Sequence, residues 1–126
     1  KLIDWEYAGM ADQLTDLGMC AIYSYYSKEE TDNLIGMYFD EVGQPASDTE
    51  RGLIYAYVAL GGLLWALWAI YKSSLGVSFG DYTLIMYRYM KDYYKEAIKY
   101  INKIGMKNIT VRFKIPYGYA NNFYHL

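Results

Sequence analysis

The hydrophobic residues of this chain recur at helical spacing along most of its length. Between residues 12 and 26, the residues Leu14, Leu17, Ala21 and Tyr25 follow one another at intervals of three or four positions. This is the spacing of one face of an α-helix. The pattern therefore predicts a first helix there, with these four side chains on one side.

Two further helices are marked by their start signals. Ser27 followed by Glu30, and Ser47 followed by Glu50, have the form of a capping box. In this motif the serine accepts a hydrogen bond from the backbone three residues on, and the glutamate reaches back to the serine N–H. Gly43 tolerates the left-handed conformation and is the predicted end of the first of these helices. The second capping box opens the longest apolar helix of the chain.

That apolar helix raises the question of a membrane. No charged residue lies between Arg51 and Lys72, and about twenty uncharged residues are long enough to span a bilayer. However, tyrosine and tryptophan lie inside the run, whereas membrane spans carry them in belts at both interfaces, and Gly61-Gly62 interrupts it. A helix that is apolar on all sides is also typical of the centre of a larger soluble protein. We therefore expect a buried helix, and a single span at 52–71 is the alternative.

A last helix is predicted over residues 82–103, with Asp81 as its N-cap. Apolar and basic residues alternate within 109–115, which favours a short strand. Residues 1–3 read as the end of a buried strand. The predicted fold is therefore mainly α, with a short strand near each end of the chain.

The first candidate for chemistry follows that opening strand. Asp4 and Glu6 project to the same side if the chain stays extended. Two carboxylates that face one way repel each other unless a cation lies between them, and Mg²⁺ prefers such oxygen ligands. A magnesium site is one interpretation, and a surface turn with two solvated acids is the other.

Composition and charge narrow the choice of partners. A length of 126 residues and a net charge of −2 fit one domain, and the basic residues form no dense cluster, so no nucleic-acid partner is expected. Seventeen tyrosines favour aromatic-lined pockets. Cys20, the single cysteine, excludes an internal disulfide, fits a reducing, cytoplasmic location and is expected to be a small buried side chain. The start shows no secretory signal, and because it reads as part of a strand we expect a piece of a longer protein.

Two tryptophans form a second candidate site. Trp65 and Trp68 lie three residues apart and therefore share one helical face. Core packing is the common role of such a pair. The alternative is an aromatic cage, in which each ring face attracts a quaternary ammonium group by about 0.5–2 kcal/mol.

Two stretches of the chain resemble one enzyme family. Residues 3–9, Ile-Asp-Trp-Glu-Tyr-Ala-Gly, with Asp12 and Asp16-Leu17-Gly18, resemble the metal-binding segment of choline and ethanolamine kinases, especially the bacterial choline kinases. Residues 64–72 with Phe79-Gly80-Asp81-Tyr82 resemble the C-terminal signature of the same family. The family is a branch of the aminoglycoside-phosphotransferase and protein-kinase-like superfamily. The resemblance implies two parts: a C-terminal helical part of a kinase-like lobe at 1–104, and a tail of unknown role at 105–126.

The resemblance also implies roles for three acidic residues. Asp4, with Glu6, would hold Mg²⁺ against the phosphates of ATP. Asp16 would brace the catalytic loop through backbone hydrogen bonds. The other interpretation of Asp16 is a first-turn acid that the helix dipole favours.

In the implied choline pocket, the two tryptophans are joined by Tyr82. Many eukaryotic members of the family hold the ammonium group with a glutamate where this chain has Tyr23. We therefore expect Tyr23, Tyr25 or Tyr26 to extend the cage in place of that carboxylate. The departure leaves the preferred amine open between choline, ethanolamine and another small cationic alcohol.

Several parts that phosphoryl transfer requires are not found in this sequence. They are a phosphate cradle, a lysine for the phosphates and a catalytic aspartate loop. We therefore expect the chain to be inactive alone and to need the missing N-terminal part of the same kinase, with ATP as co-substrate and choline or a related small amino alcohol as substrate. A non-catalytic module that binds a quaternary ammonium group is the alternative, and a membrane partner is not expected.

Overall fold

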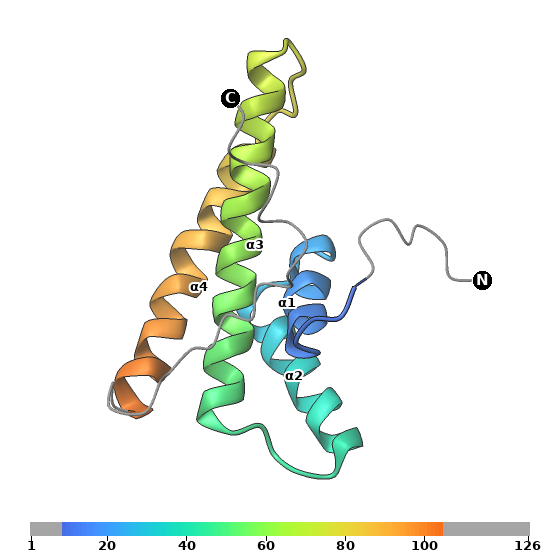
Figure 1. The fold of residues 1–126 in the computed structure, drawn as a ribbon, viewed down its shortest axis with the longest axis vertical. Coiled ribbons are helices and arrows are strands. Elements are labelled where there is room, and N and C mark those ends of the chain that lie inside the picture. Colours follow the sequence, from blue (N-terminus) through green and yellow to red (C-terminus); the bar gives the residue numbers. More distant parts are fainter. Residues whose placement is uncertain (1–8, 105–126) are drawn as a thin grey trace, which may run out of the picture.

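The part of the chain that the structure describes is helical. The structure is a computed structural model that describes residues 9–104. Its elements are α1 (Leu14–Tyr23), α2 (Lys28–Val42), α3 (Asp48–Ser74) and α4 (Tyr82–Ile104) (Figure 1). No strand occurs within the described range, and the mainly α prediction is confirmed. The strands predicted at both ends of the chain lie outside the described residues.

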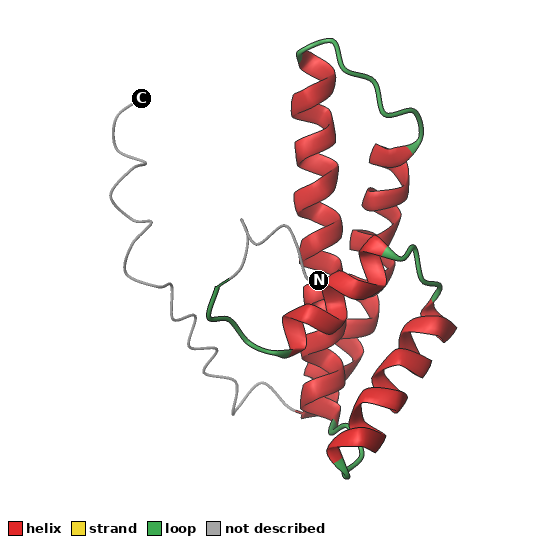
Figure 2. Ribbon diagram, turned by 90° about the vertical axis from the view of Figure 1, so that its right-hand side faces the viewer, coloured by secondary structure: helices red, strands yellow, loops and turns green. Residues whose placement is uncertain are grey.

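The longest helix, α3, is the centre of the fold. α4 packs along it and α1 packs on another side of it (Figures 1 and 2). Two glycines show that α3 and α4 are antiparallel. Gly52, near the start of α3, faces Tyr100 near the end of α4, and Gly62 faces Met86 and Met90. The hairpin therefore brings the end of α3 next to the start of α4.

The Gly61-Gly62 pair is where two helices approach α3 most closely. A Cβ atom added at Gly61 would collide with the side chain of Ile22 in α1. A Cβ atom added at Gly62 would lie 2.7 Å from the backbone nitrogen of Met90 and 2.8 Å from the carbonyl oxygen of Met86, both in α4. The pair that interrupts the apolar run therefore makes room for helices on two sides.

Among the described residues, the core is mainly apolar and contains a buried hydrogen bond between α2 and α4. Its largest fully buried side chains include Tyr55, Ile22, Ile35, Ile54, Met86 and Val58. Thr31 of α2 is also fully buried, and its hydroxyl shares a hydrogen bond of 2.7 Å with the hydroxyl of Tyr93 in α4. The bond ties α2 to α4 and gives both hydroxyls the partner that burial requires.

Both predicted capping boxes are confirmed. The Ser27 N–H donates to Glu30 at 2.8 Å, and the Glu30 N–H donates back to the Ser27 hydroxyl at 3.2 Å. Ser47 and Glu50 make the same two bonds at the same distances. α2 ends as predicted before Gly43, which has a left-handed φ of 82°. Local signals therefore set the start of α2 and of α3.

Two expectations about α1 are wrong. The pattern places Tyr25 on a helix face, but α1 ends at Tyr23, and Tyr25 is exposed with a left-handed φ of 55°. The chain reverses there, because the Tyr26 N–H turns back to donate to the Ala21 carbonyl at 2.9 Å. Cys20, expected to be buried, is exposed because the buried face of α1 runs through Ala21 instead.

One side of α3 is buried and another is not. α3 is long and apolar enough to cross a membrane by length and composition, and 44% of its most apolar stretch of 18 residues is buried inside the protein. Its buried residues include Gly52, Val58, Gly62 and Ala66. The remaining large apolar side chains define the exposed face of α3, which consists of Leu60, Leu63, Leu64, Leu67, Ile70 and Tyr71.

Candidate functional site

Five aromatic rings form a continuous cluster where α3 ends and α4 begins. The Tyr23 and Trp65 ring centroids lie 5.9 Å apart, and those of Trp65 and Trp68 lie 5.6 Å apart, both in edge-to-face arrangements. Phe79 follows at 5.0 Å from Trp68, and Tyr82 at 6.2 Å from Phe79. We call these five residues the aromatic cluster. It contains Trp65 and Trp68 of α3, Tyr23 of α1, Tyr82 of α4 and Phe79 of the loop between α3 and α4.

Three elements position the aromatic cluster. The two tryptophans lie about one turn apart on α3, and Gly62, where α3 and α4 are in close contact, lies one turn before Trp65. After α3 the chain turns at Gly76, where φ is 85° and the Val77 N–H donates to the Lys72 carbonyl at 3.1 Å. This turn returns Phe79 to the face of Trp68. The cluster therefore depends on the α3–α4 hairpin and not on either helix alone.

The cluster already attracts a cation from its own chain. The Lys72 ammonium group lies 5.8 Å from the centroid of the Trp68 ring, within the range of a cation–π interaction. The pKa of Tyr82 is raised because the ring is partly buried and because the Tyr25 and Tyr23 hydroxyls lie nearby. The Tyr82 phenol therefore stays neutral at physiological pH and keeps its proton for hydrogen bonding.

Trp65 adds an unused donor to the same place. Its indole Nε1 is buried and has no hydrogen-bond partner among the described residues. A buried N–H without a partner costs about 1–3 kcal/mol. A ligand with an acceptor atom beside Trp65 would recover part of that free energy.

Asp12 and Asp16 lie at the start of α1, whereas Tyr23 of the aromatic cluster lies at its end. Asp12 accepts hydrogen bonds from the Leu14 N–H at 2.9 Å and from the Tyr57 hydroxyl at 3.0 Å, so it fixes the start of α1 against α3. Asp16 is exposed in the first turn of α1 and makes no hydrogen bond to a described side chain. The first-turn position agrees with the helix-dipole interpretation, and the loop that Asp16 would brace is not among the described residues.

The predicted metal ligands precede α1 in the chain. Asp4 and Glu6 lie outside the described residues. Within residues 9–104, no group of three or more His, Cys, Asp or Glu side chains is close enough to hold a metal ion. The magnesium site at Asp4 and Glu6 therefore stays a prediction.

Tyr26 lies apart from the cluster. Its side chain lines a cavity between the α1–α2 turn and α4, together with Tyr25 and Arg88. Its carbonyl accepts a hydrogen bond of 2.8 Å from the Tyr89 hydroxyl. Of the tyrosines expected to extend the cage, Tyr23 contacts Trp65, whereas Tyr25 and Tyr26 line this cavity instead.

Sequence reasoning missed two members of this site. Phe79 sits between Trp68 and Tyr82 in the chain of rings, and its place in the Phe79-Gly80-Asp81-Tyr82 string was the available signal. Lys72 follows Trp68 by four residues, the helical spacing at which side chains meet. That spacing was the signal for a cation above the indole.

Comparison with known proteins finds similarity to part of a longer bacterial protein. That protein is Protein LicA of Haemophilus influenzae (strain ATCC 51907 / DSM 11121 / KW20 / Rd), which is 33% identical over 86 residues, 65% of this chain and 32% of the relative. A second Protein LicA of Haemophilus influenzae is also 33% identical over 86 residues, and there the match covers 25% of the relative. The chain therefore spans about a third or less of the curated relatives it matches. No family model and no solved structure matches it.

Proposed function

We propose that this chain supplies the amine-binding part of an ATP-dependent phosphotransferase that phosphorylates the hydroxyl of choline or a similar small amino alcohol. One observation carries the proposal. Trp65, Trp68 and Tyr82, which the family resemblance assigns to the choline pocket, belong to one continuous aromatic cluster although they come from two helices. The similarity to Protein LicA over 86 residues is compatible with the resemblance to bacterial choline kinases.

The cluster suits a quaternary ammonium group for a physical reason. Such a group cannot donate hydrogen bonds, so ring faces and charge are what can hold it. Each well-placed face contributes about 0.5–2 kcal/mol. The position of Lys72 over Trp68 supports this, because it is a cation drawn to the same surface. A bound choline headgroup would displace Lys72 or take the remaining faces.

The proposed catalytic contribution is positioning. Binding the headgroup fixes the short alcohol arm, so the hydroxyl oxygen is held where a phosphoryl group can be transferred to it. Asp4 and Glu6 are the proposed ligands of Mg²⁺, whose chemistry would be to neutralise charge on the transferred phosphoryl group. Their carboxylate oxygens match what Mg²⁺ prefers.

The described helices leave the two proposed sites within reach of each other. α1 runs parallel to α3, with Asp12 against Tyr57 at one end and Tyr23 against Trp65 at the other. Tyr57 and Trp65 are eight residues apart, or about 12 Å along the helix axis at about 1.5 Å per residue. The eight residues from Asp12 back to Asp4 can span that distance, because an extended chain covers about 3.3 Å per residue.

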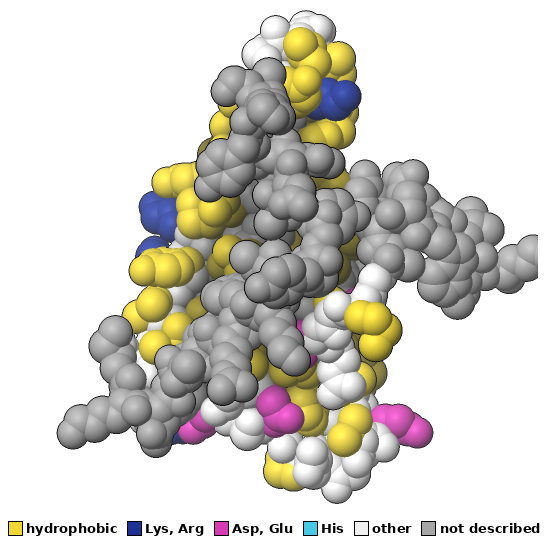
Figure 3. Space-filling view, in the orientation of Figure 1, with side chains coloured by type: hydrophobic (Ala, Val, Ile, Leu, Met, Phe, Trp, Pro, Cys, Tyr) yellow, Lys and Arg dark blue, Asp and Glu magenta, His cyan; other side chains and the backbone are white. Residues whose placement is uncertain are grey.

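The exposed face of α3 is the proposed contact for the remainder of a longer kinase. Figure 3 shows hydrophobic side chains gathered at the upper end of the molecule, where α3 ends. An apolar surface of this kind is typical of an interface. In this proposal, the N-terminal part of the same kinase covers it and supplies the nucleotide site.

The test is phosphoryl transfer from ATP to choline by the longer protein that contains this chain. Asp4→Asn should reduce kcat at least about a hundredfold and leave choline binding nearly intact, because several kcal/mol of charge stabilisation are lost. Trp68→Ala should raise the choline KM by about 2–30-fold, and Trp68→Phe, the matched control that keeps a ring face, by less. The 126-residue chain alone should not transfer phosphate. Loss of stability without either kinetic signature would reduce these residues to packing.

Two alternatives have their own tests. A non-catalytic cage would bind choline with an affinity that is indifferent to Mg²⁺-ATP in the longer protein, whereas the kinase would form a productive ternary complex. A single membrane span is favoured by the length and composition of α3 and by its exposed face. Partition of the chain into detergent or lipid would support the span, and a monodisperse chain in plain buffer would exclude it.

A further inference from the structure

A cavity lies beside the aromatic cluster, and none of the five cluster residues lines it. It has a volume of about 370 Å³ and lies between the α1–α2 turn with the first turn of α2 on one side and α4 on the other. That volume is at the small end of the range of ligand-binding pockets, about 300–1,000 Å³. We call it the α2–α4 cleft.

The aromatic wall of the α2–α4 cleft is held in place by hydrogen bonds. Tyr89 and Tyr93, one turn apart on α4, stack with ring centroids 5.8 Å apart and an interplanar angle of 8°. Both hydroxyls are engaged, Tyr89 with the Tyr26 carbonyl and Tyr93 with Thr31. Burial raises the pKa of Tyr89 to about 12, so the ring stays neutral. The rings therefore offer a fixed surface that needs no reordering when a ligand binds.

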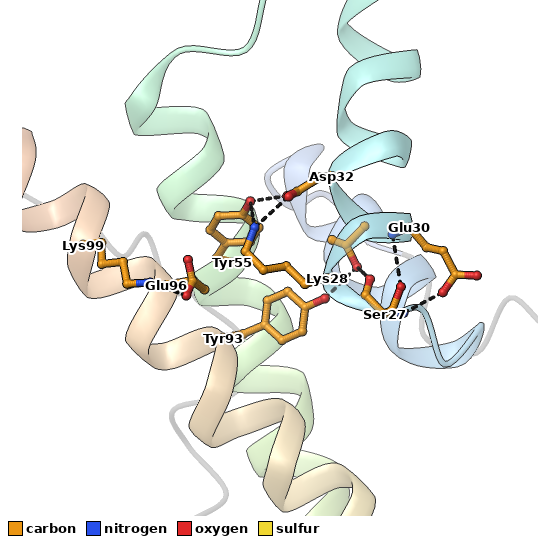
Figure 4. Close-up of polar contacts among 9 residues, drawn as sticks. Ser27, Lys28, Glu30, Asp32, Tyr55, Tyr93, Glu96 and Lys99 are labelled. Atoms are coloured by element: carbon orange, nitrogen blue, oxygen red, sulfur yellow. Dashed lines mark hydrogen bonds and ion pairs between the residues drawn. The ribbon is translucent and has the colours of Figure 1, made fainter.

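Two of the charged residues in the α2–α4 cleft are already committed. Figure 4 shows Lys28 bound to Asp32, at 2.6 Å, and Glu30 bound to Ser27 in the capping box. The hydrogen bond to Asp32 raises the pKa of Lys28, and the bond to the Ser27 backbone lowers the pKa of Glu30. Their charges are therefore largely satisfied within the protein.

The other two charged residues of the α2–α4 cleft are not engaged in this way. Arg88 and Asp92 lie one turn apart on α4, and both line the α2–α4 cleft. Arg88 makes no ion pair with any residue of the described range, and Asp92 has only an exposed contact with Lys95 at 4.0 Å. A guanidinium group and a carboxylate therefore face one small cavity, and neither neutralises the other. This arrangement complements a ligand that carries both charges.

The turn that closes the cleft holds a residue that is unusual for its backbone. Tyr25 also lines the cavity, and it adopts the left-handed φ of 55° that glycine normally supplies at the end of a helix. A large side chain in this conformation costs about 1–2 kcal/mol, and strain of this kind occurs more often at functional sites. The place of Tyr25 in the cavity wall gives that residue a use.

We propose that the α2–α4 cleft binds a small zwitterion, with the anionic group on Arg88 and the cationic group between Asp92 and the tyrosine faces. Guanidinium pairs well with a phosphate or a carboxylate, and the tyrosine rings attract an ammonium group. A phosphorylated amino alcohol belongs to this class, and it is the product of the proposed phosphotransferase. Only the choice of that ligand rests on the proposed function, because the charge pattern stands on the cleft alone.

The experiment is a calorimetric titration of the 126-residue chain with three probes: phosphocholine, choline and inorganic phosphate. Phosphocholine should bind more tightly than inorganic phosphate. Arg88→Gln should weaken phosphocholine binding at least tenfold and Asp92→Asn about threefold to tenfold. The control variant Lys91→Gln removes an exposed charge of α4 outside the cleft and should leave the affinity within twofold. Thermal unfolding of each variant checks that the fold is intact.

Each other outcome overturns the inference. Absence of phosphocholine binding does so directly. Equal affinity for inorganic phosphate would show a plain anion site. Binding that survives Arg88→Gln and is lost in Trp68→Ala would place phosphocholine in the aromatic cluster. The proposed function fails separately, if choline does not bind the aromatic cluster or if the longer protein does not transfer phosphate. Phosphocholine binding at Arg88 would still stand in either case.

Discussion

Replacing Gly62 by alanine tests the contact that holds the α3–α4 hairpin together. A Cβ atom there would lie 2.7 Å from the Met90 backbone nitrogen and 2.8 Å from the Met86 carbonyl oxygen, whereas ordinary contact begins at 3.4 Å. α4 would have to retreat by about 0.7 Å, the difference between 3.4 and 2.7 Å. These atoms are backbone, so no flexible side chain can move aside.

The expected cost follows from that overlap. Overpacking of a fitted interface costs about 1–3 kcal/mol, and the better helix propensity of alanine returns about 1 kcal/mol at most. Gly62→Ala should therefore lower the free energy of unfolding by up to about 2 kcal/mol. Gly36→Ala is the matched control, because Gly36 lies inside α2 and a Cβ atom there meets nothing within 4 Å. That control should raise the free energy of unfolding by about 0.5–1 kcal/mol.

Urea unfolding followed by far-ultraviolet circular dichroism measures the free energy of unfolding of both variants. The two variants should move the midpoint in opposite directions. In Gly62→Ala, the tryptophan fluorescence should also change before unfolding, since the aromatic cluster lies one turn further along the same interface. If both alanine variants stabilise the chain equally, the close approach of α4 to α3 is not present and the geometry of the cluster is wrong.

Three further predictions concern the turn at Tyr25, the buried hydrogen bond of Thr31 and the two capping boxes. Tyr25→Gly should raise the free energy of unfolding by about 1 kcal/mol, because glycine relieves the left-handed strain, and a thermal melt that shows destabilisation would contradict this. Thr31→Val should cost about 1–3 kcal/mol by leaving the buried Tyr93 hydroxyl unpaired, and adding Tyr93→Phe should recover part of it in a double-mutant cycle. The pKa values of Glu30 and Glu50 are lowered by their bonds to the capping serines. The ionised glutamates therefore stabilise the fold above about pH 5, and this contribution should be lost as pH falls through the lowered pKa values. Unfolding measured between pH 6 and 2 should show a steeper acid loss in the wild type than in the variant with glutamine at both positions.

The parts of this fold that the sequence predicted are those set by neighbours in the chain. The capping boxes at Ser27 and Ser47 and the stop at Gly43 depend on residues within three or four positions, and all three are confirmed. Tyr25 continued the helical pattern of α1. The helix nevertheless ends before it, because the chain reverses and the Tyr26 N–H bonds to the Ala21 carbonyl. The spacing of apolar residues alone does not show where the chain reverses. Cys20 was misjudged because an apolar run does not say which face meets α3.

The candidate site divides in the same way. The tryptophan pair was visible from its spacing on one helix, and Tyr82 from the family resemblance. The contacts of Phe79 required the turn at Gly76 to fold the loop back onto α3, which is a long-range outcome of helix packing. The α2–α4 cleft had no sequence signal at all, since its walls come from segments about sixty residues apart.

The most direct test of the amine-binding site is a titration of the 15N-labelled chain with choline, observed at the indole N–H resonances of Trp65 and Trp68. The matched control ligand is 3,3-dimethyl-1-butanol, which has the shape of choline without its charge. A cation–π contribution of about 1–2 kcal/mol predicts that choline shifts both resonances saturably, with a Kd about 5–30-fold below that of the neutral alcohol. Unchanged resonances, or equal affinity for the two ligands, would show that the aromatic cluster is packing and not a site for a cationic alcohol.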